Sequence, residues 1–255
     1  MKKNIFNTAF FCLEMLGLLV ILILSIMFSI ASIHNINMLD EVKDFISRAK
    51  FSEQLSTNDT YYYVIETDEL DEAVLDNDSK NNPILGAEGD IFLMPQSRMD
   101  FFPMFPEFVS YLFGGHAGVV IRNGSYLVEA MGGSSDQSYV LEMPTDLYEE
   151  ERTVVGLRVV ASIDERRQAA KNAISLIGKP YNYLFVLNTV GHYYCTDVCS
   201  RSYGEEFGMN YQIDTNGFHV SLQDLFRSKD TQITYVKYKL DGKTYIYYLH
   251  NPNLN

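Results

Sequence analysis

The chain has 255 residues and 47% of them are hydrophobic, which is enough to build one moderate domain around a sizeable core. Its formal net charge of −13 argues against a nucleic-acid partner, because phosphate binding requires clustered Lys and Arg side chains. Beyond Cys12, the only cysteines are Cys195 and Cys199, so no disulfide framework is expected.

Residues 15–33 form a run of nineteen uncharged, mostly large apolar residues. At about 1.5 Å per residue, a helix of this length spans the roughly 30 Å hydrocarbon core of a bilayer. Lysines precede the run and acidic residues follow it, so the positive-inside rule places the N-terminus in the cytoplasm. We expect residues 1–33 to be a cytoplasmic tip and an uncleaved, single-pass transmembrane anchor, with the remaining chain extracytoplasmic. A cleaved signal peptide is the alternative.

Residues 34–83 are predicted to connect this anchor to a folded domain. The apolar residues between 38 and 46 have helical spacing, which predicts a short amphipathic helix that lies on the membrane or packs on the domain. Residues 61–65 could form a strand. Residues 67–82 are acidic and rich in Asn, which indicates a solvated loop.

Residues 84–250 contain the signals of an α+β domain. Strands are predicted at 91–94, at 154–161, and in two hairpins whose turns are Asn123-Gly124 and Asp241-Gly242. Ser162 and Glu165 form a capping box that opens a helix ending near Gly178, and residues 221–226 indicate a second capped turn. Residues 95–115 are rich in Phe, Met and Pro without clean periodicity, which is typical of a lid or a binding surface.

Cys195 is the strongest candidate for chemistry. Cys195, Val198, Cys199 and Ser202 have the spacing of one helical face, which places Cys195 in the first turn of a helix. The exposed N–H groups and the positive end of the helix dipole there favour a thiolate. Cys199 is predicted to be a packing residue on the same helix.

His116 and Glu129 lie in the first predicted hairpin. If Asn123-Gly124 is a two-residue turn, the numbers of paired residues sum to 247, and Glu129 is the diagonal neighbour of His116 at about 7–8 Å. A carboxylate beside an imidazole fixes its tautomer and stabilises the imidazolium. We therefore predict His116 as the general base and Glu129 as its orienting residue. A strand-end histidine bonded to a backbone carbonyl is the alternative, and His192 and His219 are rival bases.

Three further residues are candidates for substrate binding: Asp90, Tyr181 and Tyr194. Asp90 follows Gly89 at the start of a strand, so turn chemistry is its alternative role. Tyr181 follows Pro180 and could line a cleft or pack in the core. Tyr194 directly precedes Cys195.

The order of these pieces resembles the YiiX/YebB-like branch of the NlpC-type papain-like cysteine hydrolases, a circularly permuted branch in which the histidine precedes the cysteine. The matching pieces are Gly89-Asp90-Ile91, His116-Ala117-Gly118-Val119-Val120-Ile121, Val128-Glu129-Ala130, Gly178-Lys179-Pro180-Tyr181-Asn182 and Tyr194-Cys195-Thr196-Asp197. The branch commonly has Ser-Glu-Leu after the cysteine, where this chain has Thr196-Asp197-Val198. The resemblance implies a permuted papain-like fold, with an antiparallel sheet packed on helices, and the roles of nucleophile for Cys195, general base for His116 and orienter for Glu129.

These observations predict a membrane-anchored cysteine hydrolase that cleaves an amide or ester bond without a cofactor or a metal ion. A cell-wall peptide is the first substrate expected, and an acylated lipid or protein is the second. Two alternatives stay open. One is a zinc site on His192, Cys195 and Cys199, with His116 or Asp197 as a fourth ligand. The other is a non-catalytic binding domain that retains the fold.

Overall fold

The computed structural model describes residues 2–76, 84–95, 115–122, 124–133, 139–145, 153–185, 191–211, 213 and 220–254. The helices are α1 (Lys2–Ser47), α3 (Ile163–Ser175), α4 (Cys195–Ser202), the 3-10 helix η3 (Glu205–Phe207) and α5 (Leu222–Arg227). The strands are β1 (Lys50–Ser52), β2 (Thr60–Glu66), β3 (Leu75–Asp76), β4 (Ile84–Leu85), β5 (Ile91–Met94), β6 (His116–Ile121), β7 (Tyr126–Met131), β8 (Tyr139–Pro144), β9 (Thr153–Val159), β10 (Thr231–Leu240) and β11 (Lys243–His250).

Within these residues, nine strands form one sheet in the order β1-β2-β11-β10-β9-β5-β6-β7-β8, and β3 pairs with β4 separately. The α+β class is confirmed. The sheet is mixed rather than antiparallel, because β2 pairs with β11 in parallel while the other neighbours are antiparallel. A parallel pair needs a long connection between its strands, and here most of the chain separates β2 from β11.

Both predicted hairpins form, and the first has the predicted register. In the first, Val119 pairs with Val128 and Ile121 pairs with Tyr126, so the paired numbers sum to 247. Asn123 itself lies outside the described residues. In the second, Leu240 pairs with Lys243 around Asp241 and Gly242, which have φ values of 51° and 77°. Two positive φ values are those of a type I′ turn, whose twist matches that of the flanking strands.

The capped helices also begin where the sequence predicts. Ser162 and Glu165 form the expected capping box at the start of α3, and Ser221 with Asp224 forms a second one at the start of α5. Helix α4 packs against β6 and β7, and α3 packs against both α4 and β6. The apolar core lies between this layer of helices and the sheet.

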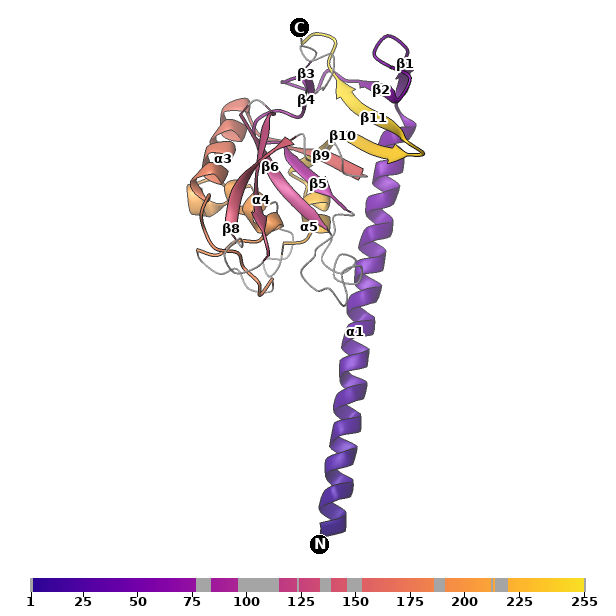
Figure 1. The fold of residues 1–255 in the computed structure, drawn as a ribbon, viewed down its shortest axis with the longest axis vertical. Coiled ribbons are helices and arrows are strands. Elements are labelled where there is room, and N and C mark those ends of the chain that lie inside the picture. Colours follow the sequence, from indigo (N-terminus) through magenta and orange to yellow (C-terminus); the bar gives the residue numbers. More distant parts are fainter. Residues whose placement is uncertain are drawn as a thin grey trace.

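Helix α1 is one continuous helix of 46 residues, so the predicted amphipathic helix is its C-terminal part rather than a separate element. There Met38 and Phe45 are buried in the core, and α1 contacts α5 and β10. The N-terminal part projects away from the domain (Figure 1) and exposes large apolar side chains from Phe10 to Ile33. Among the described residues, no helix combines the length and the hydropathy that crossing a bilayer requires. The transmembrane part of the fold prediction is therefore not confirmed.

The folded part of the chain begins well before residue 84. Strands β1 and β2 belong to the large sheet, and residues 67–76 are held against the domain rather than solvated. Leu70 and Val74 are buried in the core, and the Leu70 carbonyl accepts a hydrogen bond of 2.8 Å from Asn251. The prediction of a solvated loop is wrong for Leu70, Val74 and Leu75, which are buried in the core although the acidic composition of the segment predicts exposure. Residues 77–82, and residues 96–114 of the predicted lid, lie outside the described residues.

Candidate active site

Two neighbouring strands, β6 and β7, supply the histidine and the glutamate of the site. His116 begins β6 and Glu129 lies in β7, and the register brings the Nε2 atom of His116 to 2.9 Å from the Oε2 atom of Glu129. Both side chains are largely buried. The Glu129 carboxylate therefore accepts a hydrogen bond from Nε2–H, which leaves Nδ1 as the ring nitrogen available to another group.

Cys195 is the first residue of α4, as the helical spacing predicts. Tyr194 is the N-cap residue and makes no side-chain hydrogen bond to the first turn. Because α4 packs on β6 and β7, this end of the helix brings the buried Cys195 thiol within hydrogen-bonding reach of His116. The structure thus brings together the three predicted residues Cys195, His116 and Glu129.

The electrostatics of this group favour a charged imidazole. Burial, the largest single influence, lowers the pKa of His116, but the charges of Glu129 and Cys195 and the hydrogen bonds to both side chains outweigh it. The net result is a His116 pKa raised well above its usual 6.5. An imidazolium at neutral pH is the partner that stabilises a cysteine thiolate.

The remaining candidates for this chemistry are placed elsewhere. Cys199 is buried one turn along α4, where its Sγ atom lies 3.4 Å from the Cys195 carbonyl oxygen and burial raises its thiol pKa well above the usual range. His192 is exposed, and His219 lies outside the described residues. No three His, Cys, Asp or Glu side chains of the described part of the chain form a group that could hold a metal ion. The alternative zinc site is therefore not found there.

Two of the three predicted substrate-binding residues lie beside Cys195. Tyr181 is buried, and its pKa is raised well above 10, first by burial and then by the charge of Cys195. Its ring centroid lies 5.9 Å from that of Phe185, which in turn lies 5.7 Å from the ring of Tyr194. The three rings thus form one aromatic cluster, which includes the residue directly before Cys195. The Tyr194 hydroxyl accepts a hydrogen bond of 2.8 Å from the backbone N–H of Val220.

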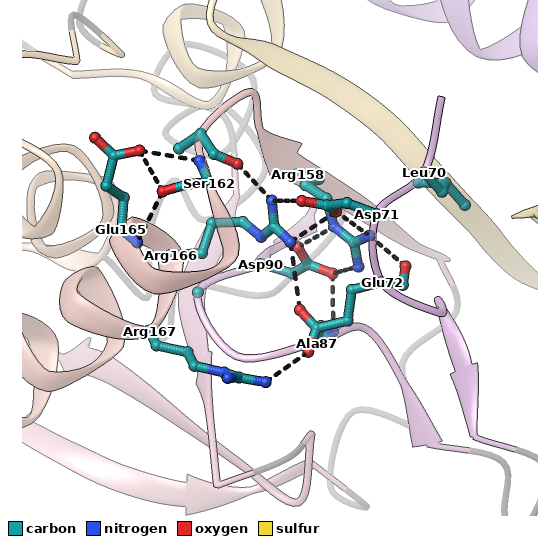
Figure 2. Close-up of polar contacts among 12 residues, drawn as sticks. Leu70, Asp71, Glu72, Ala87, Asp90, Arg158, Ser162, Glu165, Arg166 and Arg167 are labelled. Carbon is teal, nitrogen blue, oxygen red and sulfur yellow. Dashed lines mark hydrogen bonds and ion pairs between the residues drawn. The ribbon is translucent and has the colours of Figure 1, made fainter. Parts of the chain in front are cut away.

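Asp90 lies away from this group. It precedes β5, whose other end, Met94, pairs with His116. Its carboxylate is fully buried and accepts two hydrogen bonds of 2.8 Å from Arg158, and a third from the backbone N–H of Ala87 (Figure 2). A carboxylate held in this way is a structural ion pair, so we propose no substrate-binding role for Asp90.

The sequence prediction missed two features that support the site. One is the presence of two buried arginines, Arg158 and Arg166. An arginine within the apolar strand predicted at 154–161 was the signal that could have indicated the first of them. The other is Thr196, whose hydroxyl donates to the Val220 carbonyl at 2.5 Å. No local pattern indicates this second contact, because its partner lies 24 residues further along the chain.

No curated protein matches the chain. A search of solved structures finds a match to the crystal structure of the metalloprotein YiiX from Escherichia coli O157:H7, at 21% sequence identity and a TM-score of 0.44, over 58% of this chain and 96% of that one. A family model described as "permuted papain-like amidase enzyme, YaeF/YiiX, C92 family" matches residues 87–235, which is more than half of the chain. The chain therefore belongs to this family of permuted papain-like amidases.

Proposed function

We propose that this protein is a cysteine hydrolase that cleaves an amide bond through an acyl-enzyme on Cys195. The observation that carries the proposal is the His116–Glu129 pair at 2.9 Å beside a buried thiol at the start of a helix. Such a set combines a nucleophile, a base and an orienting carboxylate, which is the arrangement that nucleophilic catalysis requires.

In the proposed reaction, the Cys195 thiolate attacks the carbonyl carbon of the substrate and forms a tetrahedral oxyanion. The His116 imidazolium then donates its proton to the departing amine, the C–N bond breaks and a thioester with Cys195 remains. Water attacks this thioester while His116 accepts a proton from it, which releases the carboxylic acid and restores the thiolate. Glu129 holds the imidazole ring in one orientation and stabilises its charge throughout.

We propose that two groups stabilise the oxyanion. The first is the set of backbone N–H groups in the first turn of α4, where the first intrahelical bond goes from Val198 N to Tyr194 O. The second is the hydroxyl of the buried Tyr181, which is protonated at neutral pH, as tyrosines ordinarily are, and can donate a hydrogen bond. We propose that Tyr181 contacts the substrate carbonyl in this way.

The substrate first proposed is a cell-wall peptide, which follows from the extracytoplasmic location predicted from residues 15–33. A second candidate, an acylated lipid or protein, is favoured by exposed apolar side chains beside the site. Met131 and Tyr139 pair across β7 and β8, Tyr139 bridges to Pro180, and Leu184 is 61% exposed. Incubation with cell-wall peptides and with acyl lipids, followed by measurement of the product masses, chooses between the two.

The chemistry is tested by acylating the protein with p-nitrophenyl acetate and locating the acetyl group by peptide mass spectrometry. We expect Cys195 to react about 100-fold faster in the wild type than in His116→Ala, since a positioned base contributes about 10²–10⁴ to a rate. Exposed Cys12 serves as an internal reference for an ordinary thiol, and Cys199→Ala is the matched control on the same helix. Equal rates at Cys195 with and without His116 would contradict the pairing and favour a non-catalytic domain.

A further inference from the structure

Two hydroxyl groups on either side of Cys195 bind the same residue. The Tyr194 hydroxyl accepts a hydrogen bond of 2.8 Å from Val220 N–H, and the Thr196 hydroxyl donates one of 2.5 Å to Val220 C=O. The side chains flanking Cys195 thus satisfy both backbone polar groups of one residue, 24 and 26 positions away in sequence. This arrangement, which we name the Val220 clamp, consists of Tyr194, Thr196 and Val220.

The clamp lies in the interior of the protein. Tyr194, Thr196 and Val220 are all buried, and both hydrogen bonds are buried as well. Solvent therefore does not reach these groups and cannot replace a lost hydrogen-bond partner of Val220. Removing one hydroxyl leaves a buried backbone group of Val220 unsatisfied, which makes the two bonds strong constraints on the first turn of α4.

The clamp connects the nucleophile to a second, independently anchored part of the fold. Val220 precedes Ser221, whose side chain and that of Asp224 form the capping box of α5. Helix α5 packs against β10 and α1. Cys195 is thereby held from both sides against α5, while its partner His116 is held by the register of β6 and β7. The distance between the thiol and the imidazole depends on these two supports together.

We propose that Tyr194 and Thr196 are positioning residues, which keep the Cys195 thiol in contact with His116 by clamping Val220. The inference rests on the proposed function and gives Tyr194 a positioning role in place of the substrate-binding role predicted from the sequence. A misplacement of about 1 Å at a reacting group can reduce a rate by about 10²-fold. Loss of either hydroxyl should therefore reduce reactivity at Cys195 much more than a comparable bond lost elsewhere.

The test compares Thr196→Val, which removes the hydroxyl at nearly constant shape, with Thr196→Ser, which retains it. Thr231→Val is the matched control, because the Thr231 hydroxyl also donates to backbone carbonyls, that of Leu225 at 2.7 Å and that of Ser228 at 3.1 Å. Each protein is alkylated with iodoacetamide from pH 5 to pH 9 and acylated with p-nitrophenyl acetate, with the rates read at Cys195. Thermal unfolding of each variant measures its stability separately.

We expect Thr196→Val to acylate at least about tenfold more slowly, and its alkylation profile to approach that of His116→Ala. Thr196→Ser should restore both readouts, and Thr231→Val should lose stability without changing either. Tyr194→Phe should behave like Thr196→Val, and it replaces that variant if Thr196→Val fails to fold.

A Thr196→Val protein with the wild-type rate and profile, destabilised only as much as Thr231→Val, would overturn the inference and leave a purely structural bond. If p-nitrophenyl acetate fails to acylate Cys195 in the wild type, the proposed function fails instead. The alkylation profiles then still decide whether the clamp sets the contact between Cys195 and His116.

Discussion

At His116, burial and charge act on the imidazole in opposite directions. Burial lowers the pKa, whereas Glu129 and Cys195 raise it, and the charged partners prevail. Because the pKa in the folded protein is above that of the unfolded chain, binding of the proton stabilises the fold. This contribution is fully present below about pH 6.5 and is lost as the pH rises through the raised pKa of His116.

The substitution Glu129→Gln tests how much the carboxylate contributes to the raised pKa of His116. The substitution removes the charge and keeps the shape, so the pKa of His116 should fall and the loss of stability above about pH 6.5 should become smaller. We expect acylation of Cys195 to slow by at least about tenfold, because a positioned base contributes about 10²–10⁴ to a rate and His116 loses the charge that orients it. NMR titration of the His116 ring measures the pKa directly. A titration curve unchanged from the wild type would contradict the role of Glu129.

At the level of elements, two buried arginines bind the segment 67–76 to the catalytic domain. Arg158 pairs with Asp90 and donates to the Glu72 carbonyl, and Arg166 pairs with the Asp71 carboxylate through two bonds of 2.8 and 3.0 Å (Figure 2). The same region supports α4, because Tyr203, directly after this helix, donates from its hydroxyl to the Gly89 carbonyl at 2.6 Å.

The two acidic partners of this network should differ in their effect on stability. Asp90→Asn removes the nearest charged partner of Arg158, which is itself fully buried, and leaves only the longer contact of 3.8 Å to Asp71; breaking a buried pair costs about 3–5 kcal/mol. Asp71→Asn should cost about 1 kcal/mol, because the Asp71 side chain is 43% exposed and the buried Arg166 retains a second carboxylate, that of Glu72, at 3.3 Å. Urea denaturation measures both free energies of unfolding. Equal losses of unfolding free energy in the two variants would contradict this distinction between Asp90 and Asp71.

At Gly89, both the backbone conformation and the close packing of this region exclude a side chain. Its φ of 89° lies in the left-handed region, and a Cβ atom there would clash with the Arg166 carbonyl oxygen. The residue before Asp90 is therefore a glycine because α3 and the Tyr203 hydroxyl both approach its backbone closely.

At the scale of the whole molecule, α1 raises the question of where the protein is located. Its C-terminal part is a component of the domain, since Met38 and Phe45 are buried in the core. Its N-terminal part carries the apolar run of residues 15–33, whose side chains contribute little to that core. The membrane location predicted from this run stays a prediction, and it can be tested separately from catalysis.

Fractionation of cells that express the chain tests this location. We expect the full chain to remain in the membrane pellet at high salt and to be released by detergent, because apolar contacts are insensitive to ionic screening. A chain that begins at Ile36 keeps Met38 and Phe45 and should move to the supernatant with its Cys195 reactivity intact. Recovery of the full chain in the supernatant would contradict the prediction.

The sequence by itself determined the local parts of this protein. The turn signals Asn123-Gly124 and Asp241-Gly242 predicted two strand registers, and the first of these registers brings Glu129 to His116. The capping boxes fixed the starts of α3 and α5, and the helical spacing placed Cys195 at the start of α4. These features depend on neighbours within a few residues, where turn and cap chemistry are specific.

Only the tertiary structure decided which distant segments meet. The parallel pairing of β2 with β11, the burial of Leu70 and Val74, and the ion pair that removes Asp90 from the site all join segments far apart in the chain. The Val220 clamp around Cys195 is of the same kind. No local pattern encodes such contacts, because the packing of the whole core determines which buried polar group finds which partner.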